Sequence, residues 1–147
     1  MSETTTPRKS DDHAFEAVHV DEREWETLRF DGFESKMLFH PGPERPTEPN
    51  AGLVRFAPGA GHPLHRHDFA QIWYILEGEF VIGGNKYGPG TMIFHPDPHY
   101  EAEMHTDTGG LWLIVQYPGP TTGQPPIYSG RFNLTKRRPL AEERLDV

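Results

Sequence analysis

The sequence predicts an all-β fold, a sandwich or a barrel of about eight short strands. Short apolar runs recur along the chain, and no segment carries a sustained 3.6-residue apolar period with helix caps. Glycine and proline, 15 residues each, are spread between these runs, which is typical of many strands joined by tight turns. The stretch "IGGNKYGPGT" at residues 82–91 holds the strongest turn signals, a Gly-Gly-Asn hairpin followed by Gly-Pro-Gly.

We expect the strands near residues 24–29, 35–40, 52–56, 70–76, 79–82, 91–95, 100–105 and 111–117. The chain of 147 residues suits one domain with one core, which we place at residues 19–132. Residues 1–18 are polar and aperiodic, so we expect a disordered N-terminal arm. Residues 133–147 are interpreted as a C-terminal tail.

Composition excludes several classes of partner and site. The formal net charge of −8 disfavours nucleic acid and anionic membrane surfaces. The chain has no cysteine, so any metal must be held by nitrogen and oxygen ligands. No window approaches 18 apolar residues, and the first residues lack the apolar middle of a signal peptide. We therefore expect a cytoplasmic protein with a small-molecule substrate.

The most informative segment is "GHPLHRH", which places three histidines within six positions. Because alternate side chains of a strand share a face, His65 and His67 should point the same way as Gln71, Trp73 and Ile75. That face begins with polar groups and continues into large apolar ones, as expected for the mouth and floor of a small cavity. Trp73 would then project into the cavity, where it could stack on an aromatic or enolic ligand. His62 has the opposite parity, so it is predicted in a loop at the rim.

The residues of this segment resemble the first motif of the cupin superfamily, in particular the RmlC-like small single-domain metal-binding cupins. Gly59, His65, His67 and Gly78 fall in the register of that motif, and Gln71 stands where the family usually has glutamate. The second motif is looser. Gly90 and Pro96 match it, but His99 follows without the glycine of the turn and comes two residues early.

The resemblance implies a double-stranded β-helix of the jelly-roll type and one divalent transition metal per chain. It implies His65, His67 and His99 as metal ligands, with Gln71 as a candidate fourth. Fe(II) is favoured, with Zn, Ni, Mn or Cu as alternatives that affinity order alone does not separate. His95 and His105 are rivals of His99 for the third ligand position. The alternative without a metal is that the His-x-His pair is exposed or hydrogen-bonded in the core.

Candidate catalytic residues follow from the same face. Gln71 could orient a metal-bound substrate through its NH₂ group, and Trp73 could contact the substrate. Glu101 and Glu103 share the parity of His99, so either could act as a general base. Carboxylates on an edge strand are, however, commonly only solvated.

Three functions remain open from the sequence. The leading hypothesis is a non-haem iron dioxygenase that acts on a small enol, diketone, hydroxyketone or catechol-like chelator, since neutral ligands leave the full charge on the metal. The first alternative is a metal-dependent isomerase, lyase or hydrolase that uses Lewis-acid catalysis. The second is a non-catalytic cupin that binds a metabolite or metal. By resemblance, a homodimer is expected.

Overall fold

The computed structural model describes residues 15–28, 30–39, 48–118 and 121. Most of the predicted arm and the whole predicted tail at 133–147 therefore lie outside the described residues. The only helical element among the described residues is the 3₁₀ turn η2 (Val20–Glu22). The strands are β1 (Glu26–Thr27), β2 (Phe33–Phe39), β3 (Asn50–Phe56), β4 (Gly61–His62), β5 (His65–His67), β6 (Ala70–Gly78), β7 (Phe80–Ile82), β8 (Asn85–Tyr87), β9 (Met92–His95), β10 (His99–Glu101), β11 (Met104–His105) and β12 (Gly110–Tyr117).

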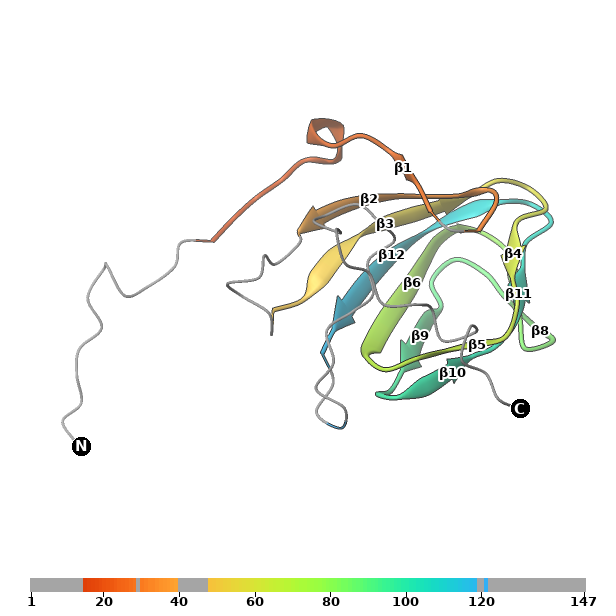
Figure 1. Cartoon of the computed structure of the whole chain (residues 1–147). Helices are drawn as coiled ribbons and strands as arrows, with labels where there is room; N and C mark the ends of the chain where they lie inside the picture. The colour runs from red at the N-terminus through yellow and green to blue at the C-terminus, as the bar shows by residue number, and fades with distance from the viewer. Residues whose placement is uncertain (1–14, 29, 40–47, 119–120, 122–147) are drawn as a thin grey trace.

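The strands form one large antiparallel sheet and two small ones. The large sheet has the order β1-β2-β3-β12-β6-β9. A second sheet has the order β4-β11-β7-β8, and β5 pairs with β10 alone. Figure 1 shows the large sheet curving over, with β5 and β10 below β6 and with β4 and β11 at the right. The predicted all-β class is confirmed.

Most predicted strands are present with shifted ends. The prediction at 24–29 shrinks to β1, and the prediction at 100–105 divides into β10 and β11. The division has a topological cause, because β10 pairs with β5 whereas β11 pairs with β4 and β7. The short strands β4, β5 and β8 carry too few residues to show an apolar period of their own.

An aromatic cluster joins the large sheet to the four-stranded sheet that contains β7. Trp73 of β6 stacks on Trp112 of β12 with ring centroids 4.1 Å apart and planes 13° apart. Phe56 of β3 packs edge-on against Trp112 at 4.4 Å and against Phe80 of β7 at 5.0 Å. All four rings are buried. Aromatic pairs in these orientations add about 0.5–1.5 kcal/mol each beyond the area they bury.

The odd-numbered residues from 65 to 75 face the interior. His65 and His67 are buried, as are Gln71, Trp73 and Ile75, although the chain forms two strands here instead of one. The predicted face, with polar groups first and apolar groups after them, is therefore present.

The surface carries several large apolar side chains. Met92 and Phe94 of the edge strand β9 are 64% and 61% exposed. The expected homodimer stays a prediction.

Within the described ranges, no helix has the length and apolar character that a membrane span requires.

Gly61 permits the close pairing of β4 with β11. A Cβ at this position would lie 2.5 Å from the Met104 carbonyl oxygen, so Gly61→Ala must push the two strands apart. We expect this substitution to lower the free energy of unfolding by about 1–3 kcal/mol, measured by urea denaturation. Gly88→Ala is the matched control, because its added Cβ meets nothing within 4 Å. Equal unfolding midpoints for the two variants would contradict the close approach.

Candidate metal centre

The pairing of β5 with β10 brings four candidate ligands together. In the antiparallel register His99 lies opposite His67, and Glu101 lies opposite His65. Residues two apart on a strand share a face, so all four side chains point to the same side. All four are buried, whereas Tyr100, between the two β10 members, is 55% exposed.

His62 reaches the same point from β4. Its side chain is buried, and Pro63 and Leu64, which separate β4 from β5, are exposed. The prediction of a rim loop is therefore wrong. The parity argument assumed one regular strand, but the chain breaks between His62 and His65, and so both imidazoles point inward.

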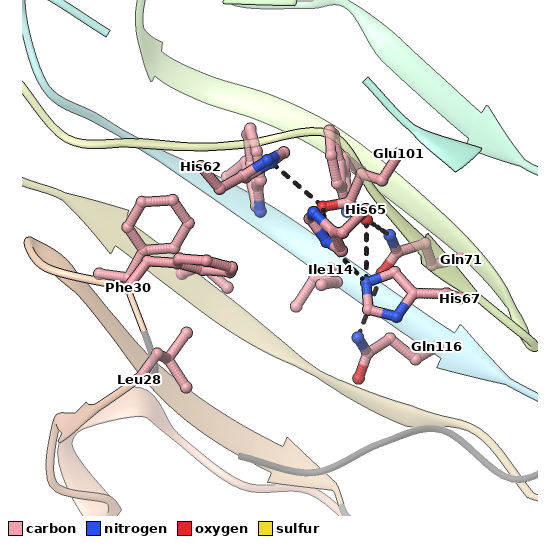
Figure 2. Close-up of a pocket in the computed structure, with 13 residues that line it drawn as sticks. Leu28, Phe30, His62, His65, His67, Gln71, Glu101, Ile114 and Gln116 are labelled. Atoms are coloured by element: carbon pink, nitrogen blue, oxygen red, sulfur yellow. Dashed lines mark hydrogen bonds and ion pairs between the residues drawn. The ribbon is translucent and has the colours of Figure 1, made fainter. Parts of the chain in front are cut away.

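The Glu101 carboxylate lies among His62, His65 and His67 (Figure 2). Its Oε2 lies 3.1 Å from Nε2 of His62 and 3.1 Å from Nε2 of His65. Its Oε1 lies 3.3 Å from Nε2 of His67 and 3.7 Å from Nε2 of His99. Each carboxylate oxygen therefore faces two imidazoles.

Backbone carbonyl groups fix the tautomers of three of these histidines. Nδ1 lies 3.1 Å from the Pro63 carbonyl oxygen in His62 and 2.7 Å from it in His65. Nδ1 of His99 lies 2.7 Å from the Pro96 carbonyl oxygen. A carbonyl oxygen only accepts, so Nδ1 carries the hydrogen, and Nε2 of a neutral ring is a bare lone pair. Bonds of this kind orient metal-ligating histidines.

With these tautomers, hydrogen-bond acceptors of the histidines and of Glu101 point at the same place. Nε2 of His62 is buried and, among the described residues, makes no hydrogen bond of acceptable angle, although Glu101 Oε2 lies close to it. Nε2 of His65 also lies 3.0 Å from Nε2 of His67, which donates to it in one tautomer, whereas Nε2 of His62 and Oε2 of Glu101 meet as two acceptors. A cation between them would stabilise this contact. The ligand atoms of His62, His65 and Glu101 all lie within 4.8 Å of one another. This donor set fits a metal ion, since adjacent ligands about 2.1 Å from one ion are about 3 Å apart.

The pKa values of Glu101 and His67 reflect two opposing effects, burial and the contacts between the two groups. Burial, the largest contribution, raises the pKa of Glu101, but the positive charge available on His67 and the polar contacts with His62 and His65 hold it well below its usual value. Burial lowers the pKa of His67, and the attraction of Glu101 only partly offsets this effect. Burial favours the neutral imidazole of His67, and the polar contacts favour the ionised carboxylate of Glu101; these are the forms in which each group binds a metal.

A cavity of about 100 Å³ opens beside the cluster. One wall is polar and includes His62, His65, His67, Gln71, Glu101 and Gln116. The other wall is apolar and includes Leu28, Phe30, Phe33, Val54, Trp73, Trp112 and Ile114. Figure 2 shows Leu28 and Phe30 facing the histidines across this space. The arrangement suits a small molecule with an oxygen-donor head and an apolar remainder.

Comparison with known proteins identifies the family. Residues 13–118 match the ChrR Cupin-like domain. The chain belongs to this family. A dimethylsulfoniopropionate lyase, DddQ of Ruegeria pomeroyi, is 33% identical over 70 residues, which cover 44% of this chain and 35% of that protein. The chain thus spans about a third of that relative's length.

Solved structures give the fold of this cupin. A RmlC-like cupin from Shewanella frigidimarina has a TM-score of 0.59 at 25% identity, covering 74% of this chain and 95% of that one. An acetylacetone dioxygenase from Acinetobacter johnsonii has a TM-score of 0.61 at 13% identity, covering 80% of this chain and 81% of that one. The cupin superfamily and the jelly-roll architecture predicted from the sequence are confirmed.

The structure brings together most of the predicted site residues. His65, His67, Gln71 and His99 lie within one buried cluster, although their coordination of a metal stays a prediction. The Gln71 oxygen accepts a hydrogen bond from Gln116 at 3.1 Å, and its NH₂ group faces Glu101.

The other predictions have mixed outcomes. Trp73 lines the cavity, as predicted, but its face is stacked on Trp112. His105 and Glu103 are exposed, so the structure removes both from the site. Sequence reasoning missed the central place of Glu101. The signal was the spacing, because Glu101 stands where the second cupin motif has its histidine, two residues after His99.

His95 is buried beside the cluster but is not one of the residues around Glu101. Its ring centroid lies 4.2 Å from that of Trp73 and 4.6 Å from that of His99. Burial, opposed by the attraction of Glu101, lowers the pKa of His95 from 6.5 to about 4. Between about pH 4 and pH 6.5, the His95 ring is therefore neutral in the folded state and protonated in the unfolded chain.

This shift predicts acid sensitivity of the metal-free protein. Because the folded-state pKa of His95 is depressed, its destabilising effect grows as pH falls from about 6.5 toward 4. From pH 7 to pH 5 we expect His95 alone to lower the free energy of unfolding by about 2 kcal/mol. His95→Gln should remove much of that dependence in urea denaturation, whereas His105→Gln, at an exposed position, should not. Parallel pH profiles for wild type and His95→Gln would contradict the shift.

Proposed function

We propose that this cupin is a mononuclear metal-dependent dioxygenase that uses Fe(II) and acts on a small chelating enol, diketone, hydroxyketone or catechol-like substrate. One observation carries the proposal. His62, His65 and Glu101 converge as two imidazoles and one carboxylate, all buried, beside a cavity. Two histidines and one carboxylate with open positions are the donor set typical of non-haem Fe(II) oxygenases. His67, whose Nε2 lies 3.0 Å from that of His65, is the candidate fourth ligand.

The charge of this donor set favours a monoanionic substrate. The sequence-based argument assumed neutral ligands and a full charge of 2+ on the metal. With Glu101 among the ligands the net charge becomes about 1+, which one enolate or catecholate oxygen neutralises. Glu101 is also the only Asp, Glu, Lys or Arg among the described residues that line the cavity. A substrate with a second, remote charge would therefore find no partner in the described lining.

The chain's own residues bind and orient such a substrate. Leu28, Phe30 and Ile114 form apolar surface opposite the polar wall, so they would hold an apolar group and exclude water from the reacting end. The metal, when bound, would supply positions for the substrate oxygens and for O₂. Gln71, through its contact with Glu101, would help to keep the carboxylate in place.

The relatives favour two different candidate functions. A protein named as an acetylacetone dioxygenase has this fold, so the proposal requires no new architecture. DddQ, which is named as a lyase, favours a second candidate, an elimination or isomerisation in which the metal acts only as a Lewis acid. The two candidates differ in whether O₂ is consumed.

The test is oxygen uptake by protein purified without a histidine tag. The protein is loaded anaerobically with Fe(II) or with Zn(II), and each form is mixed with β-diketones, hydroxyketones and catechols. The proposal predicts uptake of one O₂ per substrate consumed in the Fe(II) form and none in the Zn(II) form. Equal turnover of both forms without oxygen uptake would establish the Lewis-acid candidate. Binding without turnover in either form would exclude both enzymatic functions for these substrates.

A further inference from the structure

Three side-chain amides form a row across the large sheet, ending at the metal centre. The amides belong to Asn50 of β3, Gln116 of β12 and Gln71 of β6. These strands are neighbours, and the register places Gln116 opposite both Asn50 and Gln71. Asn50 is completely buried, Gln71 is 2% exposed and Gln116 is half-buried. Buried amides in such a row need one another as hydrogen-bond partners.

The hydrogen bonds of the row run in one direction. Nδ2 of Asn50 donates to Oε1 of Gln116 at 2.7 Å, and Nε2 of Gln116 donates to Oε1 of Gln71 at 3.1 Å. Nε2 of Gln71 then donates to Oε1 of Glu101. A carboxylate only accepts, so Glu101 fixes the orientation of Gln71, and Gln71 in turn fixes that of Gln116.

The row gives the two Glu101 oxygens different contacts. Oε1 is engaged by Gln71, whose Nε2 also lies 3.5 Å from Nε2 of His99. Oε2 is left facing His62 and His65 at 3.1 Å each. A carboxylate held in this way offers one oxygen, and not two, to an ion at the His62–His65 side. One-oxygen coordination leaves an additional position open for substrate.

We propose that Asn50, Gln116 and Gln71 act as an amide relay, a set of positioning residues that keeps Glu101 a one-oxygen ligand of the metal. This inference rests on the proposed metal centre. It assigns Gln71 to the support of Glu101, with its oxygen directed to Gln116 and away from the ion. Supporting hydrogen bonds of this type commonly change metal affinity by about 10- to 100-fold.

The decisive comparison is between two substitutions of Gln116. Gln116→Glu keeps the shape but replaces the donor to Gln71 with a second carboxylate, so the Gln71 amide lies between two acceptors and its NH₂ group is drawn away from Glu101 by the new one. Gln116→Leu removes both bonds but leaves the Gln71 NH₂ group free to stay on Glu101. We therefore expect Co(II) affinity to fall about 10- to 100-fold in Gln116→Glu and less than about 5-fold in Gln116→Leu. A purely packing role predicts the opposite order, because glutamate is the better isostere.

The visible absorption of the Co(II) form is the second readout. Gln71→Leu releases Oε1, so Glu101 can bind through both oxygens, and the bands should weaken toward the type seen at higher coordination number. The midpoint of thermal unfolding of each metal-free variant reports on folding separately. Unchanged Co(II) affinity and an unchanged spectrum in all three variants would overturn the relay while leaving the metal centre in place. A wild-type protein that binds no Co(II) would overturn both.

Discussion

Glu101→Gln is expected to abolish metal binding under conditions in which the wild-type protein carries one ion per chain. The carboxylate is buried, and its two oxygens face four imidazoles at 3.1–3.7 Å. Its replacement by a neutral amide removes the only negative ligand and places an NH₂ donor beside the imidazoles. We expect affinity for Fe(II) or Zn(II) to fall by more than about 100-fold, beyond the loss typical of residues that only support a ligand.

The measurement is metal content after dialysis against a buffered chelator. Glu103→Gln is the matched control, because it makes the same chemical change two residues away at an exposed position. That control should keep its metal and its thermal midpoint. Retention of a full equivalent of metal by Glu101→Gln would show that the carboxylate is not a ligand.

The second large expected effect is loss of metal on substitution of His62, with a smaller loss on substitution of His99. Nε2 of His62 lies 3.1 Å from Oε2 of Glu101, with no hydrogen-bond partner among the described residues. Nε2 of His99 lies 3.7 Å from Oε1 and faces the Gln71 amide. We therefore expect His62→Ala to lose most of its metal, together with the added thermal stability that bound metal gives the wild type. His99→Ala should retain the larger share.

The thermal midpoints of both variants are compared with and without added Zn(II). His105→Ala, which truncates an exposed histidine, controls for loss of imidazole alone. A midpoint that still rises with Zn(II) in His62→Ala but not in His99→Ala would return the third ligand to His99, as the cupin motif predicts.

The sequence was sufficient to predict the inward face of β5 and β6. The two-residue period of a strand survives the break between His67 and Ala70, so Gln71 and Trp73 are buried on the predicted side. The same reasoning failed for His62 because it treated the chain as one strand. Proline restricts the preceding residue to extended conformations and cannot donate a backbone hydrogen bond, so Pro63 was a local signal for a break.

The rest of the site depends on contacts that no local pattern contains. Gln71 could be identified as a departure from the motif, but the direction of its amide is set by Gln116, 45 residues further along the chain. The role of Glu101 needed the β5–β10 register, which places it opposite His65. Its spacing from Pro96 matches the motif, but the motif has histidine at this position, so the sequence predicted Glu101 only as a candidate general base.

Anomalous diffraction from crystals of the metal-loaded protein, recorded at the absorption edge of the metal, tests the central claim most directly. We expect one peak per chain, about 2.0–2.3 Å from Nε2 of His62, Nε2 of His65 and one oxygen of Glu101. A peak held by His65, His67 and His99, with both Glu101 oxygens beyond bonding distance, would contradict this account of the site.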